Sequence, residues 1–258
     1  MAPAKASWEV ETPSLHTNEE IDDFIKRRLT ETGIDYASYV RVIRNPLLEQ
    51  QLREKIKNFA DFANRMEPYR ERGLVHLQNS RISASRKKGL LDLQLEKVMH
   101  EVATCLDHFL GVHDILMSWG HPEKVASVGL YHAVYGTEFN PITTLDPVSD
   151  SDREWLSAIV GRTSERWIHL YGTFSSDDFI TRVGAEPDAR SVVLASGEEL
   201  SRKDIAVLSD VLVANSYQPF YETGEKDILV RLRQFEPLRP HLSRGAREAL
   251  DVGRVLVG

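Results

Sequence analysis

HFLGVHDILMSWGHPEKVASVGLYHAVYGTEF, residues 108–139, is the stretch of sequence that decides the fold. The segment leading into it has apolar residues at alternating spacings of three and four, the pattern of one buried helix face. These residues are Leu91, Leu95, Val98, Val102, Cys105, Phe109, Val112 and Leu116. Gly120 is suited to end this helix and Pro122 to begin the next one. The run from Val125 to Tyr135 is almost entirely apolar, so we expect it at the centre of a helical core.

Three further helices are expected downstream, because helical periodicity follows residues that can cap a helix N-terminus. The capping residues are Asp150 or Ser151, Ser201 and Ser243. Pro219 is expected to stop the second of these helices. Residues 184–200 are interpreted as a loop with a short β-like run, SVVL, that is too small for a sheet. The sequence therefore predicts an all-α fold.

Upstream, the segment 46–66 shows one apolar helix face, and Pro68 ends that helix. The next segment, ERGLVHLQNSRISASRKKG at 71–89, is polar and basic. It is either a solvated loop or an anion-binding rim, since guanidinium groups offer paired donors to phosphate, sulfate or carboxylate oxygens. The ligand-binding residues predicted there are Arg81, Arg86 and Lys87.

Composition limits the class of protein. The chain has 258 residues, 41% hydrophobic side chains and one cysteine, Cys105, so a large core needs no disulfide framework. The net charge of −7 argues against a nucleic-acid partner. We find no apolar stretch long enough for a membrane span and no secretory h-region, so we expect a cytoplasmic protein.

Two histidines stand out because they lie in apolar surroundings. His108 lies at the edge of the apolar face, and His132 lies inside GLYHAVYG, where an imidazole must find a partner or lose its charge. Asp210 and Asn215 interrupt a later helix rich in Ile, Leu and Val. Each histidine alone fits a hydrogen-bonded core residue, but two imidazoles near a buried carboxylate also fit a divalent-metal site or a proton relay.

Other candidates receive smaller roles. His169 lies on the helix after residue 150 and is predicted to line the same cavity. The pair His113-Asp114 is predicted to be exposed or to act as a local cap, and the remaining histidines lie in polar surroundings and are given no role. We find no phosphate-binding glycine-rich loop, no G-x-S-x-G, no H-E-x-x-H and no cysteine-rich metal motif, which excludes several large enzyme classes.

The block 108–139, with its WG-x-x-E and GLYH-x-x-YGT patterns, resembles a family of largely unknown function within the HD (His-Asp) superfamily. The resemblance covers about residues 90–220 and implies an orthogonal helical bundle with a central crevice. It does not explain the first ninety residues, in which we expect a flexible arm at 1–20, polar and without period, and an N-terminal helical extension at 21–89. After the HD-like domain we expect a helical tail at 221–258 that packs on it.

The superfamily holds its metals with a His, a His-Asp pair and a late Asp. Carried over, these positions fall on His108, His132 and Asp210, but Ala133 stands where the Asp after the second His belongs. The resemblance thus implies Fe, Mn or Zn on these three side chains, or a metal-free pocket in which His132 and Tyr135 act by proton transfer or hydrogen bonding. Glu138 can replace the missing carboxylate only if its turn folds back.

The expected function is that of an enzyme acting on a small polar or anionic metabolite, in specialised metabolism. Its chemistry is either metal-assisted hydrolysis or oxidation, or metal-free elimination or cyclisation by proton transfer. The alternative is a non-catalytic ligand- or partner-binding module on a degenerate HD scaffold. Expected partners are a small-molecule substrate and, through the N-terminal helices, a second copy or another protein, with no nucleic acid and no membrane.

Overall fold

The computed structural model describes residues 67–100, 103–137, 144–223 and 230–257. The chain divides into two compact units, Ser7–Glu71 and a larger one that contains Arg72–Gly258. The histidines discussed below belong to the larger unit. The predicted arm at 1–20, the predicted helix at 46–66 and Glu138 lie outside the described residues.

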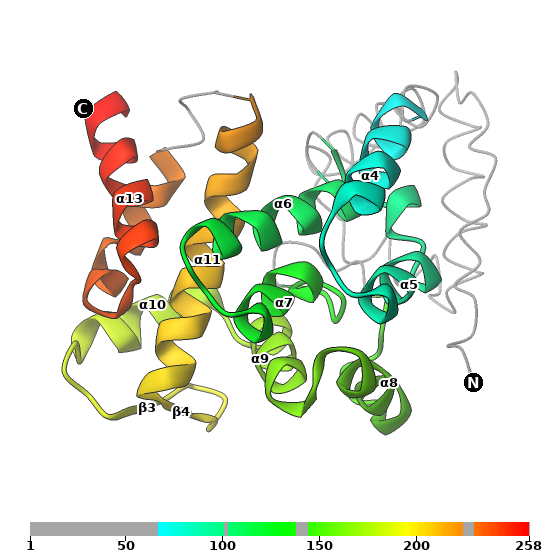
Figure 1. Cartoon of the computed structure of the whole chain (residues 1–258). Helices are drawn as coiled ribbons and strands as arrows, with labels where there is room; N and C mark the ends of the chain where they lie inside the picture. Colours follow the sequence, from blue (N-terminus) through cyan, green and yellow to red (C-terminus); the bar gives the residue numbers. More distant parts are fainter. Residues whose placement is uncertain (1–66, 101–102, 138–143, 224–229, 258) are drawn as a thin grey trace, which may run out of the picture. The chain divides into compact units, whose positions relative to one another are not determined.

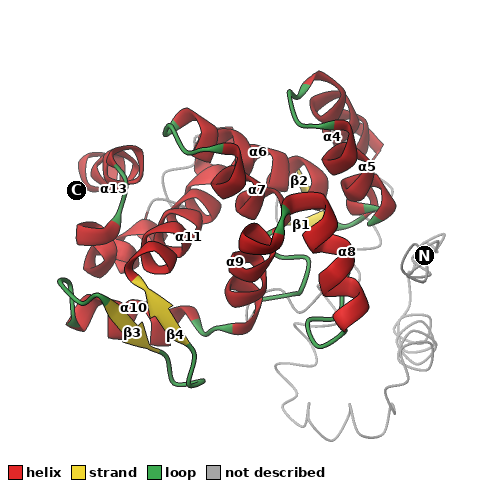
Figure 2. Cartoon of the chain, turned by 60° about the horizontal axis from the view of Figure 1, so that its bottom comes forward, coloured by secondary structure: helices red, strands yellow, loops and turns green. Residues whose placement is uncertain are grey.

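The described part of the chain is mostly helical, which confirms the all-α class (Figure 1). Its α-helices are α4 (Glu67–Asn79), α5 (Ala84–Asp92), α6 (Cys105–Ser118), α7 (Glu123–Tyr131), α8 (Asp150–Val160), α9 (Arg162–Thr173), α10 (Ser176–Ala185), α11 (Arg202–Thr223) and α13 (Arg244–Val257). The 3-10 segments are η1 (Leu95–Lys97) and η2 (Arg231–His241). The short strands are β1 (Met99–His100), β2 (Ala103–Thr104), β3 (Ser191–Val193) and β4 (Glu199–Ser201). They form two antiparallel pairs, β1 with β2 and β3 with β4, the second of which lies beside α10 (Figure 2).

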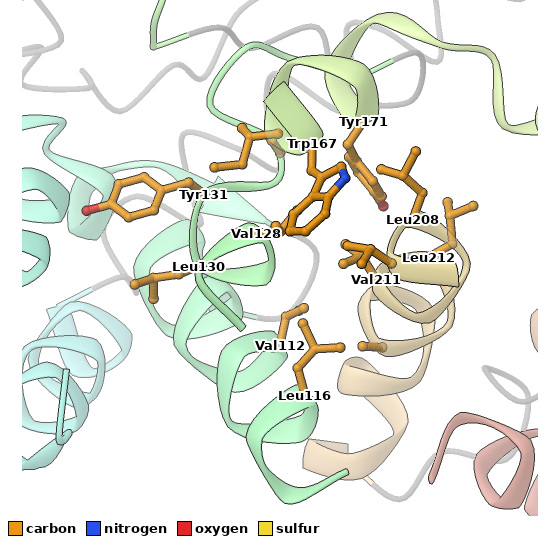
Figure 3. Packing of buried hydrophobic residues seen from close by; sticks show 14 of the residues in the cluster. Val112, Leu116, Val128, Leu130, Tyr131, Trp167, Tyr171, Leu208, Val211 and Leu212 are labelled. Carbon is orange, nitrogen blue, oxygen red and sulfur yellow. The ribbon is translucent and has the colours of Figure 1, made fainter. Parts of the chain in front are cut away.

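The core forms where α6, α7, α9 and α11 pack together (Figure 3). Val112 and Leu116 of α6 belong to one buried cluster with Val128 of α7, Trp167 of α9 and Val211 of α11, and Val128 lies beside the Trp167 ring. Every side chain from Val125 to Tyr135 is buried, as the unbroken apolar run predicts. Of the polar residues near this core, His108 lies on α6 and Asn215 on α11, while His132 directly follows α7.

The predicted continuous helix from Leu91 to Leu116 is wrong. The chain leaves α5 at Asp92, turns through Gln94 in the left-handed region (φ 53°), and passes η1, β1 and β2 before α6 begins at Cys105. Thr104 caps the new helix, because its side chain accepts a hydrogen bond from the backbone N–H of Asp107. The three-four spacing continues across the break because Leu95 is buried as well, although it lies in the 3-10 segment η1 and not in an α-helix.

The loop interpretation of the segment 71–89 is also wrong, because most of it lies in α4 and α5. Leu77 and Ile82 are buried, so the segment has an apolar side despite its many charges. The chain between the two helices is short, and α5 begins directly after Ser83.

Three smaller expectations are corrected further along the chain. The helix after residue 150 divides at Gly161, whose φ of +86° suits a residue without Cβ, into α8 and α9. The run SVVL does form a small antiparallel pair with Glu199–Ser201. α11 continues through Pro219 to Thr223, with Gln218 and Pro219 both buried, so tertiary packing overrides the helix-breaking tendency of proline.

Several punctuation residues behave as predicted. Gly120 follows α6 with φ +85°, and Pro122 immediately precedes α7. Ser201 and Ser243 each accept a hydrogen bond from a backbone N–H three residues later, as N-caps do. Within the described residues, no helix is both long enough and apolar enough to cross a bilayer.

Candidate functional site

The ends of two helices place His108 and His132 in the core. Thr104 fixes the start of α6, so His108 lies in its first turns, and His132 directly follows α7. Nδ1 of His132 donates a hydrogen bond to the carbonyl oxygen of Gly129, at 2.7 Å, across the last turn of α7. Both histidines are only 1% exposed.

The two imidazole rings meet each other. Their centroids are 5.3 Å apart and their planes are nearly perpendicular, at 73°. Phe109 and Tyr171 pack on the His132 ring with centroid distances of 4.7 and 5.4 Å. The sequence therefore identified two histidines that the fold does bring together, and Tyr171 of α9 is an additional member that it missed.

Two amides from α11 complete this cluster. Nε2 of His108 lies 2.8 Å from Oδ1 of Asn215, and Nδ1 of His108 lies 2.7 Å from Oε1 of Gln218. Nδ2 of Asn215 donates to the hydroxyl of Tyr171 at 3.0 Å, and the Asn215 side chain is also a hydrogen-bond partner of His132. Asn215 was predicted from the sequence and Gln218 was not.

Burial controls the charge of His132. Burial, and after it the neighbouring His108 ring, lower the pKa of His132 to about 3, against the opposing hydrogen bonds to Gly129 and Asn215. His132 is therefore neutral near pH 7. Because Nδ1 donates to a carbonyl, which only accepts, Nε2 is the unprotonated nitrogen of this ring.

Asp210 does not join the histidine pair, which corrects the predicted grouping. Its Oδ1 accepts from the backbone N–H of Ser243 at 3.0 Å, and its Oδ2 lies 2.7 Å from Nε2 of His121. Asp210 thus joins α11 to the start of α13 and to the turn after α6. Its direction around α11 takes it away from Asn215, and the partner it finds is a histidine to which the sequence gave no role.

The side chains predicted to bind a metal, His108, His132 and Asp210, do not form a metal site. Metals of the expected kinds need three or more close ligands, and in the described residues no group of three His, Cys, Asp or Glu side chains is arranged to hold one. His108 and His132 supply two nitrogens, Asp210 faces elsewhere, and Ala133 supplies no carboxylate.

Tyr135 belongs to a second buried cluster. Its hydroxyl donates to Oε1 of Glu165 at 3.1 Å, and Arg153 binds both oxygens of that carboxylate at 2.8 and 3.2 Å. Burial raises the pKa of Tyr135, and the Glu165 carboxylate adds to the effect. His169 packs edge-on against the Tyr135 ring at 5.7 Å, and burial followed by Arg153 lowers its pKa. Tyr135 and His169 therefore lie together, beside a carboxylate instead of the His108–His132 pair.

The three residues predicted to bind an anion, Arg81, Arg86 and Lys87, have different surroundings. Arg86 donates to Oε1 of Glu123 at 3.1 Å, and Lys87 donates to the backbone carbonyl of Gln78 at 3.0 Å. Arg81 is exposed between α4 and α5. Arg86 already has a carboxylate partner within the protein, so it is less suited than Arg81 to bind an external anion.

The sequence also underrated a histidine–carboxylate cluster formed by His76, Asp107, His113 and Asp114. The two ring nitrogens of His76 contact Asp107 at 3.0 Å and Asp114 at 2.9 Å. These hydrogen bonds, first that to Asp107 and then that to Asp114, raise the pKa of His76 to about 9. His113 forms a hydrogen bond with Asp114 at 3.0 Å. The pair was predicted to be exposed, but only Asp114 is exposed, because the His113 side chain is buried.

The fold and the histidine pair define an all-α protein with a buried, amide-lined imidazole cluster. A family model described as a domain of unknown function (DUF6817) matches residues 90–175. This range contains His108, His132 and Tyr171 and ends before Asn215 and Gln218. No curated protein and no solved structure matches the chain.

Proposed function

We propose that the chain is a metal-independent acid–base enzyme for a small anionic metabolite, on a divergent HD-superfamily scaffold. The observation that supports this most is the state of His132: a buried, neutral imidazole whose Nδ1 is fixed by Gly129, so that Nε2 is its basic nitrogen. A buried ionisable group with a shifted pKa beside a second imidazole is a recognised mark of a functional site.

The charge environment indicates the substrate class. The contacts of His132 described above include no carboxylate: they are the Gly129 carbonyl, the Asn215 amide, the rings of Phe109 and Tyr171, and the His108 ring, which itself lowers the pKa of His132. A group with a pKa of about 3 is a weak base at pH 7. A carboxylate or phosphate placed near the ring raises that pKa, because an opposite charge stabilises the imidazolium. Proton transfer at His132 therefore requires an anionic substrate or intermediate.

The proposed chemistry is proton abstraction and return, as in an elimination or cyclisation. His132 accepts a proton at Nε2, and Asn215, which contacts both imidazoles, holds the two rings in register. A cytoplasmic role in specialised metabolism, the anion-binding use of Arg81, and recognition of a second protein chain through the N-terminal segment belong to this same proposal.

The test compares the full chain with His132→Gln. Wild type is incubated with a mixture of small mono- and dicarboxylates and phosphate monoesters, and substrate loss and product gain are followed by mass spectrometry. We expect turnover that falls about 100-fold or more in His132→Gln, the size typical of losing a general acid–base group. The matched control is His241→Gln, which replaces another buried histidine, from η2, and should keep the activity.

A second candidate function is a non-catalytic binding module. It is favoured by the use of Asp210 in a contact with His121 and the start of α13, which removes the late Asp from the histidine pair. Under this alternative, anionic metabolites raise Tm without being converted. The stabilisation persists in His132→Gln, since binding then occurs elsewhere on the fold.

A further inference from the structure

Gln218 holds one side of His108 in a way that no sequence pattern indicated. It lies on α11, is 5% exposed, and its Oε1 is 2.7 Å from Nδ1 of His108. Asn215, three residues earlier on the same helix, faces the opposite nitrogen of that ring at 2.8 Å. Residues three apart lie on one helix face, so α11 holds the imidazole between two amides.

The facing helix gives Gln218 the room it needs through Gly111. A Cβ at position 111 would lie 2.7 Å from Nε2, 2.9 Å from Cγ and 3.1 Å from Cδ of Gln218. A helix with glycine in its interior is less stable than one with alanine at the same position, so Gly111 in the middle of α6 calls for a compensating contact. The close approach of the Gln218 amide is that contact.

We propose that Gln218 is a positioning residue of the His108–His132 site, which fixes the ring of His108 through Nδ1 and needs glycine at position 111 to do so. An amide can present either its carbonyl oxygen or its NH2 group to the same neighbour. By rotating, Gln218 can therefore accept from Nδ1–H or donate to an unprotonated Nδ1. His108 keeps a hydrogen bond at Nδ1 whichever form the ring takes.

Asn215 holds the other side of the ring. Asn215 also donates to the Tyr171 hydroxyl at 3.0 Å, so turning its amide disturbs a second contact. Nε2 of His108 therefore stays toward Asn215, while Gln218 provides the hydrogen bond at Nδ1. The catalytic meaning of this arrangement rests on the proposed function, but the arrangement itself can be tested without a substrate.

The first experiment measures the ring directly. In the full chain with 15N-labelled histidine, NMR distinguishes protonated from unprotonated imidazole nitrogens, and His108→Gln assigns the signals. Gln218→Glu offers only acceptor oxygens, so we expect Nδ1 of His108 to become fully protonated at pH 7. Gln218→Leu removes the partner, so we expect the Nδ1 signal to shift and the balance of protonated forms to change.

A purely structural role predicts a different result. In that case both variants change thermal stability while the two nitrogen signals of His108 stay as in wild type, and this outcome overturns the proposal. If turnover has been found, activity adds a second reading: a positioning role lowers kcat with little change in KM. Failure to find any turnover counts against the proposed enzyme, whereas the NMR result concerns Gln218 alone.

A second experiment covers the case in which Gln218→Glu does not fold. Gly111→Ala should lower Tm by about 3 °C or more, although alanine is the better helix former, because the new methyl group collides with the amide. In Gln218→Ala the collision is gone, so adding Gly111→Ala there should leave Tm unchanged or raise it. Equal effects of Gly111→Ala in both backgrounds would show that Gln218 does not set the requirement for glycine.

Discussion

His132 and His76 show how partners determine the charge of the same side chain. His132 lies in the core among a carbonyl, an amide and aromatic rings, and its pKa falls to about 3. His76 lies on α4 between two carboxylates of α6, and its pKa rises to about 9. One imidazole is therefore neutral and the other cationic at pH 7, within one compact unit.

The difference separates a site that can change its state from one that holds the fold together. A neutral imidazole in a dry environment gains a proton only when something compensates the charge, which makes His132 responsive to an anion. A cation between Asp107 and Asp114 is already compensated and joins α4 to two turns of α6. The predictions below test this contrast through stability and pH.

The largest expected effect comes from His132 in acid. Its folded pKa of about 3 lies below the unfolded value of 6.5, so between these values the unfolded chain binds a proton that the folded chain does not. Stability present above pH 6.5 is lost as pH falls toward 3, by up to about 1.4 kcal/mol per pH unit. Denaturant unfolding from pH 7 to pH 4 should show a shallower loss for His132→Gln than for wild type.

Wild type and His132→Gln contain the same titrating carboxylates, so the effect of these carboxylates cancels in the difference between the two curves of stability against pH. Parallel curves would show that His132 takes up protons in the folded state as readily as in the unfolded one. That result would remove the distinction between His132 and His76 on which the proposed site depends.

Asp107→Asn is expected to have the next largest effect, at about 2 kcal/mol of unfolding free energy. Asp107 is nearly buried and forms charged contacts with both His76 and Arg72. Burial alone raises its pKa, but the hydrogen bond from His76 and the charge of Arg72 outweigh this and lower it. Asparagine keeps the size but loses the charge, and hydrogen bonds to charged groups contribute roughly 1.5–3 kcal/mol. Urea unfolding at pH 7 measures the loss; a change below about 0.5 kcal/mol would contradict it.

Sequence reasoning succeeded where a pattern was local. His108 and His132 were recognisable because they interrupt apolar helix faces, and α6 and α7 carry those faces into the core as the periodicity predicts. Gly120 and Pro122 marked the boundary between the two helices for a similar reason, since their backbone preferences do not depend on distant residues.

Sequence reasoning failed where a residue's partners depend on which way its side chain points from a helix, or lie far away in the sequence. Asp210 is on the predicted helix, but which way it faces depends on the packing of α13 and on His121 in the turn after α6. His76 looked unremarkable because its surroundings in sequence are polar, and its two partners lie 31 and 38 residues away. Neither arrangement has a signature in one sequence.

One error had a readable cause. The start of α6 is marked by Thr104 followed three residues later by Asp107, a capping pattern that competes with a helix running straight through. Giving the cap more weight than the three-four spacing would have divided the predicted helix correctly. Gln94 in the left-handed region gave no comparable signal.

The third effect is alkaline and concerns His76. Its folded pKa of about 9 lies above the unfolded 6.5, so its contribution is complete below pH 6.5 and is lost as pH rises through 9. Because the side chain is partly exposed, solvent screening reduces this contribution to about 1 kcal/mol. His76→Gln should therefore be less stable than wild type at pH 6 and nearly equal at pH 10. A gap that stays constant with pH would show that His76 contributes by packing and not by charge.

The smallest effect is expected for Asp114→Asn, which removes the other carboxylate partner of His76. Asp114 is 54% exposed, whereas Asp107 is 8% exposed, and their distances to the His76 ring differ by only 0.1 Å. Water and salt screen the exposed pair, so we expect a loss below about 0.5 kcal/mol at low salt. It should vanish in 1 M NaCl, where the Debye length is about 3 Å. If Asp114→Asn instead loses as much unfolding free energy as Asp107→Asn, burial does not determine the contribution of the two carboxylates. The charge of His76 would then determine it for both.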